Sequence, residues 1–126
     1  MYKFNLDECP GKSKGEGEYN RIIKLLASPN SKIVAPDFAL GIVLIEPGHL
    51  HEIHNHLDNR EVVVIYEGSG TIHQKDGDEG IFVKKGDVIG FEKNEPHGFS
   101  NSGDEQFSVL WIYYPAGVAE NNFLIK

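Results

Sequence analysis

Apolar residues in this chain fall into short runs that are separated by polar or glycine-containing turns. The first long run covers residues 38–45 and ends at Pro47 and Gly48, which favour a turn. Residues 71–75 and 80–83 flank a polar turn in the manner of a β-hairpin. The other runs are also short, and most are rich in β-branched or aromatic residues: 33–35, 61–67, 88–91, 96–100 and 107–114. This pattern predicts an all-β protein with an antiparallel sandwich or barrel.

The pattern near the N-terminus is different. Residues 1–16 have no regular apolar period, so we interpret them as an arm. Over residues 17–27 the apolar side chains have helical spacing, which predicts a short helix, and the Ser-Pro-Asn sequence at residues 28–30 would end it. The residues that make this apolar stripe are Ile22, Ile23, Leu25 and Leu26. We expect the helix to cover an edge or end of the barrel, and binding of a partner is the alternative.

A length of 126 residues is typical of one compact domain. We expect three segments: an N-terminal arm with a short helix at residues 1–30, a β-barrel at residues 31–115 and a tail at residues 116–126. The tail contains an apolar stretch at residues 123–125, which we expect to pack on the barrel exterior or on a neighbouring subunit. Exposed strand edges and this apolar tail together predict a homodimer.

Composition restricts the partners and the location of the protein. The formal net charge is −7 and the sequence has no stripe of lysine or arginine, which argues against nucleic acid and anionic membranes as partners. Cys9 is the single cysteine, so no internal disulfide can form and a reducing compartment is expected. The sequence shows neither a signal-peptide pattern nor an apolar stretch of about 18 residues. These features predict a cytoplasmic protein.

Four of the six histidines lie in one short segment that begins at Gly48. Two of them, His54 and His56, are two positions apart, so both side chains leave the same face of a β-strand. A polar turn at residues 57–60 separates them from Glu61, which can therefore return beside the two histidines on the next strand. Two imidazoles and one carboxylate form a ligand set suited to Fe(II), Mn(II) or a similar divalent ion.

Two longer patterns in the chain resemble the motifs of the cupin family. The first motif matches Gly48, His54, His56, Glu61 and Gly68. The second motif matches Gly86, Asp87, Pro96, His97 and Asn101. The resemblance implies a cupin-type double-stranded β-helix, or jelly-roll barrel, and also points to a homodimer. It implies further that His97 joins His54, His56 and Glu61 as ligands of one divalent metal ion per chain, with Fe, Mn, Ni, Zn and Co as candidates.

Several other polar residues near these motifs have open roles. Glu52 shares the parity of the ligands and stands where many cupins have a proline, so it is a candidate general base or substrate anchor, or else a solvated residue at the rim. His73 is a candidate acid or base, but its strand has a single apolar residue and its facing is undetermined. His49 and His51 have the opposite parity and are expected to face away from the metal. We expect packing or interface roles for the aromatic residues Tyr66, Trp111, Tyr113 and Tyr114.

The sequence has no nucleophile elbow, phosphate-binding loop or dinucleotide fingerprint, so chemistry is assigned to the metal ion. Four protein ligands leave two positions of a six-coordinate ion for a chelating substrate, or for substrate and dioxygen. We therefore expect an enzyme that acts on a small oxygen-bearing metabolite, either a dioxygenase-type oxidoreductase or a redox-neutral isomerase, lyase or decarboxylase. The alternative is a non-catalytic module that binds a sugar or organic acid. Glu52 and His73 directed inward would favour catalysis, whereas an apolar cavity would favour dioxygen chemistry or simple binding.

Overall fold

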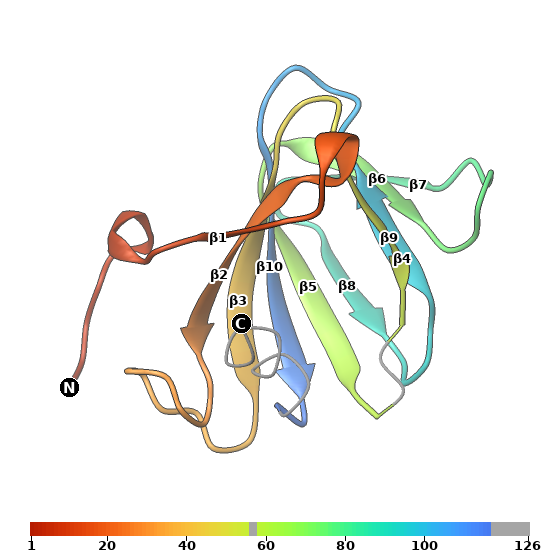
Figure 1. The fold of residues 1–126 in the computed structure, drawn as a ribbon. Coiled ribbons are helices and arrows are strands. Elements are labelled where there is room, and N and C mark those ends of the chain that lie inside the picture. Colours follow the sequence, from red (N-terminus) through yellow and green to blue (C-terminus); the bar gives the residue numbers. More distant parts are fainter. Residues whose placement is uncertain (56–57, 117–126) are drawn as a thin grey trace.

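The chain folds into two antiparallel β-sheets that face each other, as shown by a computed structural model that describes residues 1–55 and 58–116 (Figure 1). Within these residues the larger sheet has six strands, in the order β1 (Lys12–Lys14), β2 (Arg21–Ala27), β3 (Ala39–Ile45), β10 (Phe107–Tyr114), β5 (Arg60–Glu67) and β8 (Val88–Phe91). The smaller sheet of the same residues has four strands, in the order β4 (Leu50–His54), β9 (His97–Ser100), β6 (Ser69–His73) and β7 (Ile81–Lys84). The predicted all-β jelly-roll architecture is confirmed.

The core lies between the two sheets and follows from side-chain alternation along the strands. Val63 and Ile65 of β5 are 0% and 1% exposed, whereas Val62 is 42% exposed. Every second side chain of β5 therefore points toward the smaller sheet, from which Phe99 enters the same apolar cluster. The same alternation places Glu61, two positions before Val63, on the inward face of β5.

The helix expected over residues 17–27 does not form. Gly17–Tyr19 make one 3-10 turn (η2), and β2 then pairs with β3 along its length. Adjacent β-branched residues, Ile22 and Ile23, suit a strand, and the edge of β3 offers hydrogen-bonding partners to the backbone of the whole segment. Pairing with a sheet edge therefore outweighs the helical spacing of a short apolar stripe.

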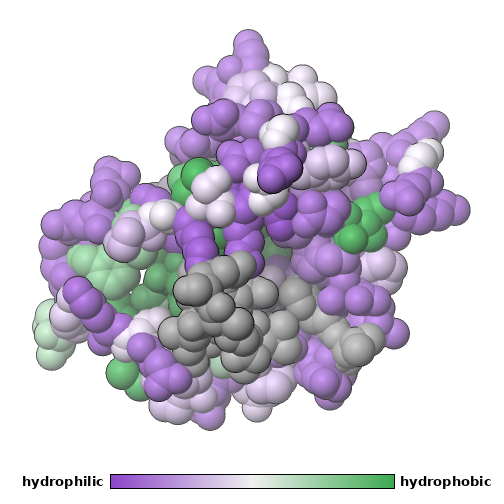
Figure 2. All heavy atoms as spheres, viewed as in Figure 1, coloured by the Kyte–Doolittle hydropathy of each residue, from purple (hydrophilic) through white to green (hydrophobic). Residues whose placement is uncertain are grey.

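The N-terminal arm is attached to β2 by contacts from its start and middle. It contains a second 3-10 turn, η1 (Leu6–Glu8), and β1, which pairs with β2. The Lys24 ammonium donates a hydrogen bond of 2.8 Å to the Leu6 carbonyl oxygen. Residues 12–27 thus contribute two strands to the larger sheet instead of lying only against it. Figure 2 shows that this face of the molecule is mainly hydrophilic, with apolar residues exposed in small areas.

The predicted tail begins at Ala116, which is 4% exposed and packs in the core. The tail packing predicted for residues 123–125 lies outside the described residues, as do residues 56–57. Within the described part of the chain, no helix has the length and apolar character needed to cross a membrane.

Candidate metal centre

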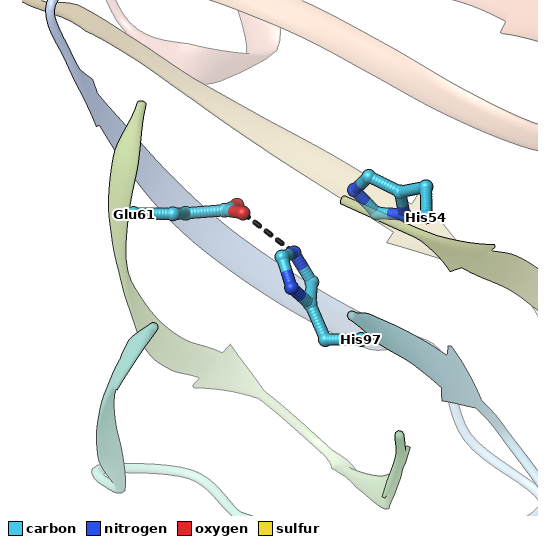
Figure 3. Close-up of side chains that lie close together, drawn as sticks. All are labelled: His54, Glu61 and His97. Carbon is cyan, nitrogen blue, oxygen red and sulfur yellow. Dashed lines mark ion pairs between the residues drawn. The ribbon is translucent and has the colours of Figure 1, made fainter. Parts of the chain in front are cut away.

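Glu61, His54 and His97 come together between the two sheets (Figure 3). Glu61 lies near the start of β5 and is 4% exposed, and His97 opens β9 and is 1% exposed. His54 ends β4, where it pairs directly with His97. One potential ligand atom from each residue lies within 4.8 Å of the others. Strand pairing therefore brings the two imidazoles together, and Glu61 adds its carboxylate from the facing sheet.

His56, the remaining member of the predicted ligand set, lies outside the described residues. The structure thus brings together three of the four predicted ligands. A metal-binding role for His56 stays a prediction from the spacing of the histidine motif.

Hydrogen bonds of two ring nitrogens determine which nitrogen of each histidine is available to a metal. His97 Nδ1 lies 2.9 Å from the Glu95 carbonyl oxygen, and His54 Nδ1 lies 3.2 Å from the Glu52 carbonyl oxygen. A carbonyl oxygen can only accept, so each Nδ1 donates a hydrogen. In a neutral ring the lone pair is then on Nε2, which is the form in which imidazole binds a metal ion.

The closest contact in the site joins the two sheets. His97 Nε2 lies 2.7 Å from Glu61 Oε1, as the dashed line in Figure 3 marks. Because His97 Nδ1 already carries a hydrogen, a neutral ring would turn its Nε2 lone pair toward the lone pairs of a carboxylate. Two such atoms at this distance need a proton between them, or a cation bound by both. The arrangement therefore fits a divalent metal ion, which would replace that proton.

A β-bulge brings His51 to the same face of β4 as His54. The strands pair His51 with Phe99 and His54 with His97, so three steps along β4 correspond to two steps along β9. The rings of His51 and His54 stack with centroids 4.4 Å apart, and the His51 side chain is 14% exposed. The expectation that His51 faces away from the metal ligands is therefore wrong. The expectation counted alternate positions along an unbroken strand. The extra residue of the bulge reverses which face His51 occupies relative to His54.

His51 is a neutral imidazole beside the candidate ligands. Burial lowers the pKa of His51 well below its usual value, and the nearby His54 lowers this pKa further. His51 Nδ1 donates to the Glu52 carbonyl oxygen at 2.9 Å, which leaves the lone pair on Nε2. The sequence analysis did not predict that His51 lies beside the candidate ligands. The one signal for it in the sequence is that His51 belongs to the histidine-rich segment that begins at Gly48.

Glu52 lies outside this cluster. Its carboxylate is 49% exposed and pairs with both terminal nitrogens of Arg21, at 2.9 and 3.2 Å. The Arg21 side chain is 9% exposed, so Glu52 neutralises a nearly buried cation. His49 is held by a 2.7 Å hydrogen bond from Nδ1 to the Asn20 carbonyl oxygen. A catalytic role for Glu52 stays a prediction, and the observed contacts of its carboxylate are structural.

His73 lies on the other side of the smaller sheet. Its neighbour Ile72 is 4% exposed and packs in the core, so alternation along β6 directs His73 outward. There the ring contacts Asp78 and Ser100. The structure thus answers the open question of its facing, while its catalytic role stays a prediction.

Aromatic side chains surround the candidate ligands. Phe91 stacks on His97 with ring centroids 3.9 Å apart, and Trp111 stacks on Tyr113 with centroids 4.7 Å apart. Burial raises the pKa of Tyr113 well above its usual value, and the charge of Glu61 raises this pKa further. The phenol of Tyr113 therefore remains protonated beside the carboxylate. Trp111 is 6% exposed, which agrees with the packing role expected for it.

Other motif residues shape the turns around the site. Gly68 has a φ angle of +75°, and a Cβ at this position would lie 2.2 Å from the Gln106 carbonyl oxygen, so only glycine fits. Asn101 is 2% exposed, and its amide nitrogen donates to the carbonyl oxygens of Ile45 and Glu105 at 2.9 and 2.8 Å. These contacts hold the loop after β9 against the end of β3, and so support the strand that carries His97.

The fold and the site define a small jelly-roll barrel with a candidate metal centre between its sheets. Residues 41–113, more than half of the chain, match the cupin domain family. The chain belongs to the cupin family.

Comparisons with individual proteins agree with this assignment. An uncharacterised protein of Methanocaldococcus jannaschii is 34% identical over 106 residues, which are 83% of this chain and 82% of the relative. The structure of a predicted oxalate decarboxylase of Thermotoga maritima matches with a TM-score of 0.73 at 20% identity. The match covers 90% of this chain and 99% of that protein's chain. The structure of a sugar phosphate isomerase of Silicibacter pomeroyi matches with a TM-score of 0.71 at 20% identity. This match covers 90% of this chain and 75% of that protein's chain. At such identities the two solved structures show the shared fold.

Proposed function

We propose that this chain binds one divalent transition-metal ion and acts with it on a small oxygen-bearing metabolite. His54, Glu61 and His97 would hold the ion, and the histidine motif supplies His56 as the fourth ligand. The observation that carries the proposal is the 2.7 Å approach of His97 Nε2 to Glu61 Oε1 inside the barrel. Fe, Mn, Ni, Zn and Co are all compatible with imidazole and carboxylate ligands.

A bound divalent ion would supply Lewis-acid chemistry by polarising an oxygen of a chelating substrate. The residues of the chain prepare this site in advance. The carbonyl groups of Glu52 and Glu95 orient the rings of His54 and His97, and the Phe91 ring covers one face of His97. Because the imidazole of His51 is neutral and keeps a lone pair on Nε2, it is the candidate acceptor for a substrate proton.

We infer a small carboxylate or a sugar-like hydroxy-carbonyl compound as the substrate class. Such molecules can chelate an ion through two oxygens, which matches the two positions that four protein ligands leave open. The names of the two structures similar in fold, a predicted oxalate decarboxylase and a sugar phosphate isomerase, agree with this class. The neutral imidazole of His51 can take up a substrate proton in a redox-neutral reaction, as in an isomerase, lyase or decarboxylase. A dioxygenase reaction at the same ion is the other reaction class.

A second candidate function is a non-catalytic module that binds a sugar or an organic acid. It is favoured by the placement of the two residues expected to act in catalysis. The Glu52 carboxylate is engaged by Arg21, and His73 is directed to the outer face of the smaller sheet. Binding and catalysis share the metal ligands, so turnover has to distinguish them.

Metal analysis of protein purified without chelator tests the proposal. We expect about one divalent ion per chain after reconstitution. The metal-loaded protein would then be incubated with small carboxylates and hydroxy-carbonyl sugars while product formation and oxygen consumption are followed. Turnover without oxygen consumption supports the redox-neutral reaction, turnover with it supports a dioxygenase, and binding alone supports the second candidate. A protein that takes up no divalent transition metal at neutral pH contradicts the proposal.

We also propose that the chain forms a homodimer, and that it is cytoplasmic. The support for the dimer is the outer face of the larger sheet, where β5, β8 and β10 expose apolar side chains. Val62 and Ile112 are directly paired and are 42% and 39% exposed, and Val88 and Tyr114 are 65% and 62% exposed. A second copy of the chain that covers this face would remove these side chains from water. The support for the location is the single cysteine.

A further inference from the structure

The outer face of the smaller sheet carries a group of reactive side chains that the metal centre does not use. Ile72 and Phe99 are paired across β6 and β9 and are buried in the core, at 4% and 3% exposed. Their chain neighbours His73 and Ser100 therefore lie on the opposite, outer face. The turn after β6 brings Asp78 to the same place, where its carboxylate contacts the ring of His73.

These three residues form a continuous hydrogen-bonded line. Asp78 Oδ1 lies 2.7 Å from His73 Nδ1, and His73 Nε2 lies 2.9 Å from Ser100 Oγ. A carboxylate oxygen accepts, so Nδ1 carries the hydrogen and Nε2 of the neutral ring has the lone pair. Nε2 therefore accepts the hydrogen bond from the Ser100 hydroxyl. Aspartate, histidine and serine in this order, with this tautomer, are the arrangement that activates a serine hydroxyl as a nucleophile.

The line ends at a surface cavity of about 340 Å³, which is lined by His73, Asp78 and Ser100 together with residues of β4 and of the turn after β6. The side chains of Tyr19 and Ile53 give the cavity an apolar wall. Its charged lining residues are Glu52, Lys75, Asp76 and Asp78. A cavity of this size, beside a hydroxyl and its base, can receive a small molecule.

We infer that this cavity is a second chemical site, in which Ser100 attacks small acyl esters with His73 as its general base. Ser100 Oγ would form a bond to the acyl carbon while its proton passes to His73 Nε2. Collapse of the tetrahedral intermediate would break the ester bond, and His73 would return the proton to the departing alcohol. A water molecule would then hydrolyse the acyl-serine by the same route, so that one ester and one water give one acid and one alcohol.

The lining of the cavity selects among esters. Glu52 is already paired with Arg21, and the remaining carboxylates of the lining, Asp76 and Asp78, outnumber the Lys75 ammonium, so an anionic substrate would be repelled. Lys75 is the cationic lining residue and can stabilise the oxyanion of the intermediate. Uncharged esters with a short acyl group fit the size and the charge of the site. Asp78 contacts His73 and not the reacting atoms, so it acts as a positioning residue.

The competing explanation is that the three residues only fasten the β6–β7 hairpin. Asp78 Oδ2 also accepts hydrogen bonds from the backbone nitrogens of Gln74 and Lys75, at 2.9 and 3.2 Å, which stabilise the turn. A fastening role needs no reactive hydroxyl. Chemical reactivity of Ser100 therefore separates the two explanations.

The test is covalent labelling of the metal-loaded 126-residue chain with an alkyl fluorophosphonate, repeated after removal of the metal with a chelator. Serine Oγ attacks the phosphorus and fluoride leaves, and the labelled peptide is identified by mass spectrometry. We expect one label per chain on Ser100, with or without metal. Ser100→Ala should not be labelled. His73→Gln should be labelled at least about 100-fold more slowly than the unmodified protein, as expected for loss of a general base. Ser102→Ala, which changes an exposed serine two positions away, should react like the unmodified protein.

Three further outcomes decide the matter. The absence of a label on Ser100 in the unmodified protein overturns the inference, whatever the variants do. Equal labelling rates for folded His73→Gln and the unmodified protein also overturn it. For the positioning residue, Asp78→Asn should slow the labelling and change its pH dependence. Glu79→Gln, which changes an exposed residue of the same loop outside the cavity lining, should do neither. Identical pH profiles for both variants would exclude the role of Asp78.

Discussion

Glu61 on the larger sheet reaches across the barrel to His97 on the smaller sheet, and the facing atoms Oε1 and Nε2 lie 2.7 Å apart. The two residues belong to β5 and β9, which are not neighbours in either sheet. An ion bound by both side chains would therefore connect the two halves of the barrel. Since a ligand that binds the folded chain stabilises it by mass action, metal binding should raise the unfolding temperature.

His97→Ala should sharply lower the metal content of the protein, because it removes the imidazole that faces Glu61. It should also lower the free energy of unfolding by about 1–3 kcal/mol, since the buried Glu61 carboxylate loses its partner. The matched control is His49→Ala, because His49 Nδ1 is engaged by the Asn20 carbonyl group away from the cluster. Elemental analysis of both variants checks this prediction, and equal metal content in the two would contradict it.

Metal affinity should fall when the pH drops below about 6. Metal ions compete with protons for imidazole nitrogens, and free histidine titrates near pH 6.5. If a proton joins His97 Nε2 to Glu61 in the metal-free protein, binding must displace it. Calorimetric titrations in buffers with different ionisation enthalpies should therefore show proton release at neutral pH. Binding without any proton release would show that the metal does not enter this pair.

Glu52→Gln should destabilise the protein by about 1–2 kcal/mol without changing its metal content. The change removes the charge partner of the nearly buried Arg21, although the half-exposed position of Glu52 reduces the effect. The control is Glu92→Gln, because Glu92 pairs with Arg60 at 3.3 Å with both side chains exposed, and its loss should cost less than about 0.5 kcal/mol. Urea denaturation measures the change in the free energy of unfolding for both variants. Once a substrate is known, unchanged turnover and binding in Glu52→Gln would also refute the predicted catalytic role.

Stability in acid should depend on Asp78. The backbone N–H of Gln74, followed by the ring of His73, lowers the pKa of Asp78 from its usual value. A carboxylate whose pKa is lower in the folded than in the unfolded state adds stability above the unfolded-state pKa, and this stability is lost as the pH falls through the folded-state pKa. Unfolding temperatures should therefore fall below about pH 4, and Asp78→Asn should flatten this fall. Asp76→Asn, which changes an exposed residue of the same turn, should leave the pH profile unchanged.

Light scattering should show a particle of about twice the chain mass of 14.1 kDa at micromolar concentration. Ile112→Lys on the exposed face of the larger sheet should shift the protein toward the monomer. Ile81→Lys, at a residue of β7 that is 63% exposed on the smaller sheet, is the control and should not. A monomer mass for the unmodified protein would disprove the homodimer.

The sequence by itself determined the all-β class of the protein and most of its candidate metal ligands. Strand alternation is a local property, so the burial of Glu61 with Val63 could be read from their spacing. The glycine of the motif at residue 68 was also a local signal, because its positive φ angle tolerates no side chain there. The pairing of Glu61 with His97 depended on the family motifs, since no local pattern relates two residues so far apart in the chain.

Only the tertiary structure decided three other features. The apolar spacing of residues 17–27 predicted a helix, and the edge of β3 selected a strand instead. His51 lies beside His54 because a bulge adds one residue to β4, which no parity count can anticipate. His73 met Ser100 because β6 and β9 are neighbours in the smaller sheet, although 27 positions separate the two residues. In each case the deciding interaction is a pairing between strands distant in sequence, whose register depends on the whole sheet and not on local spacing.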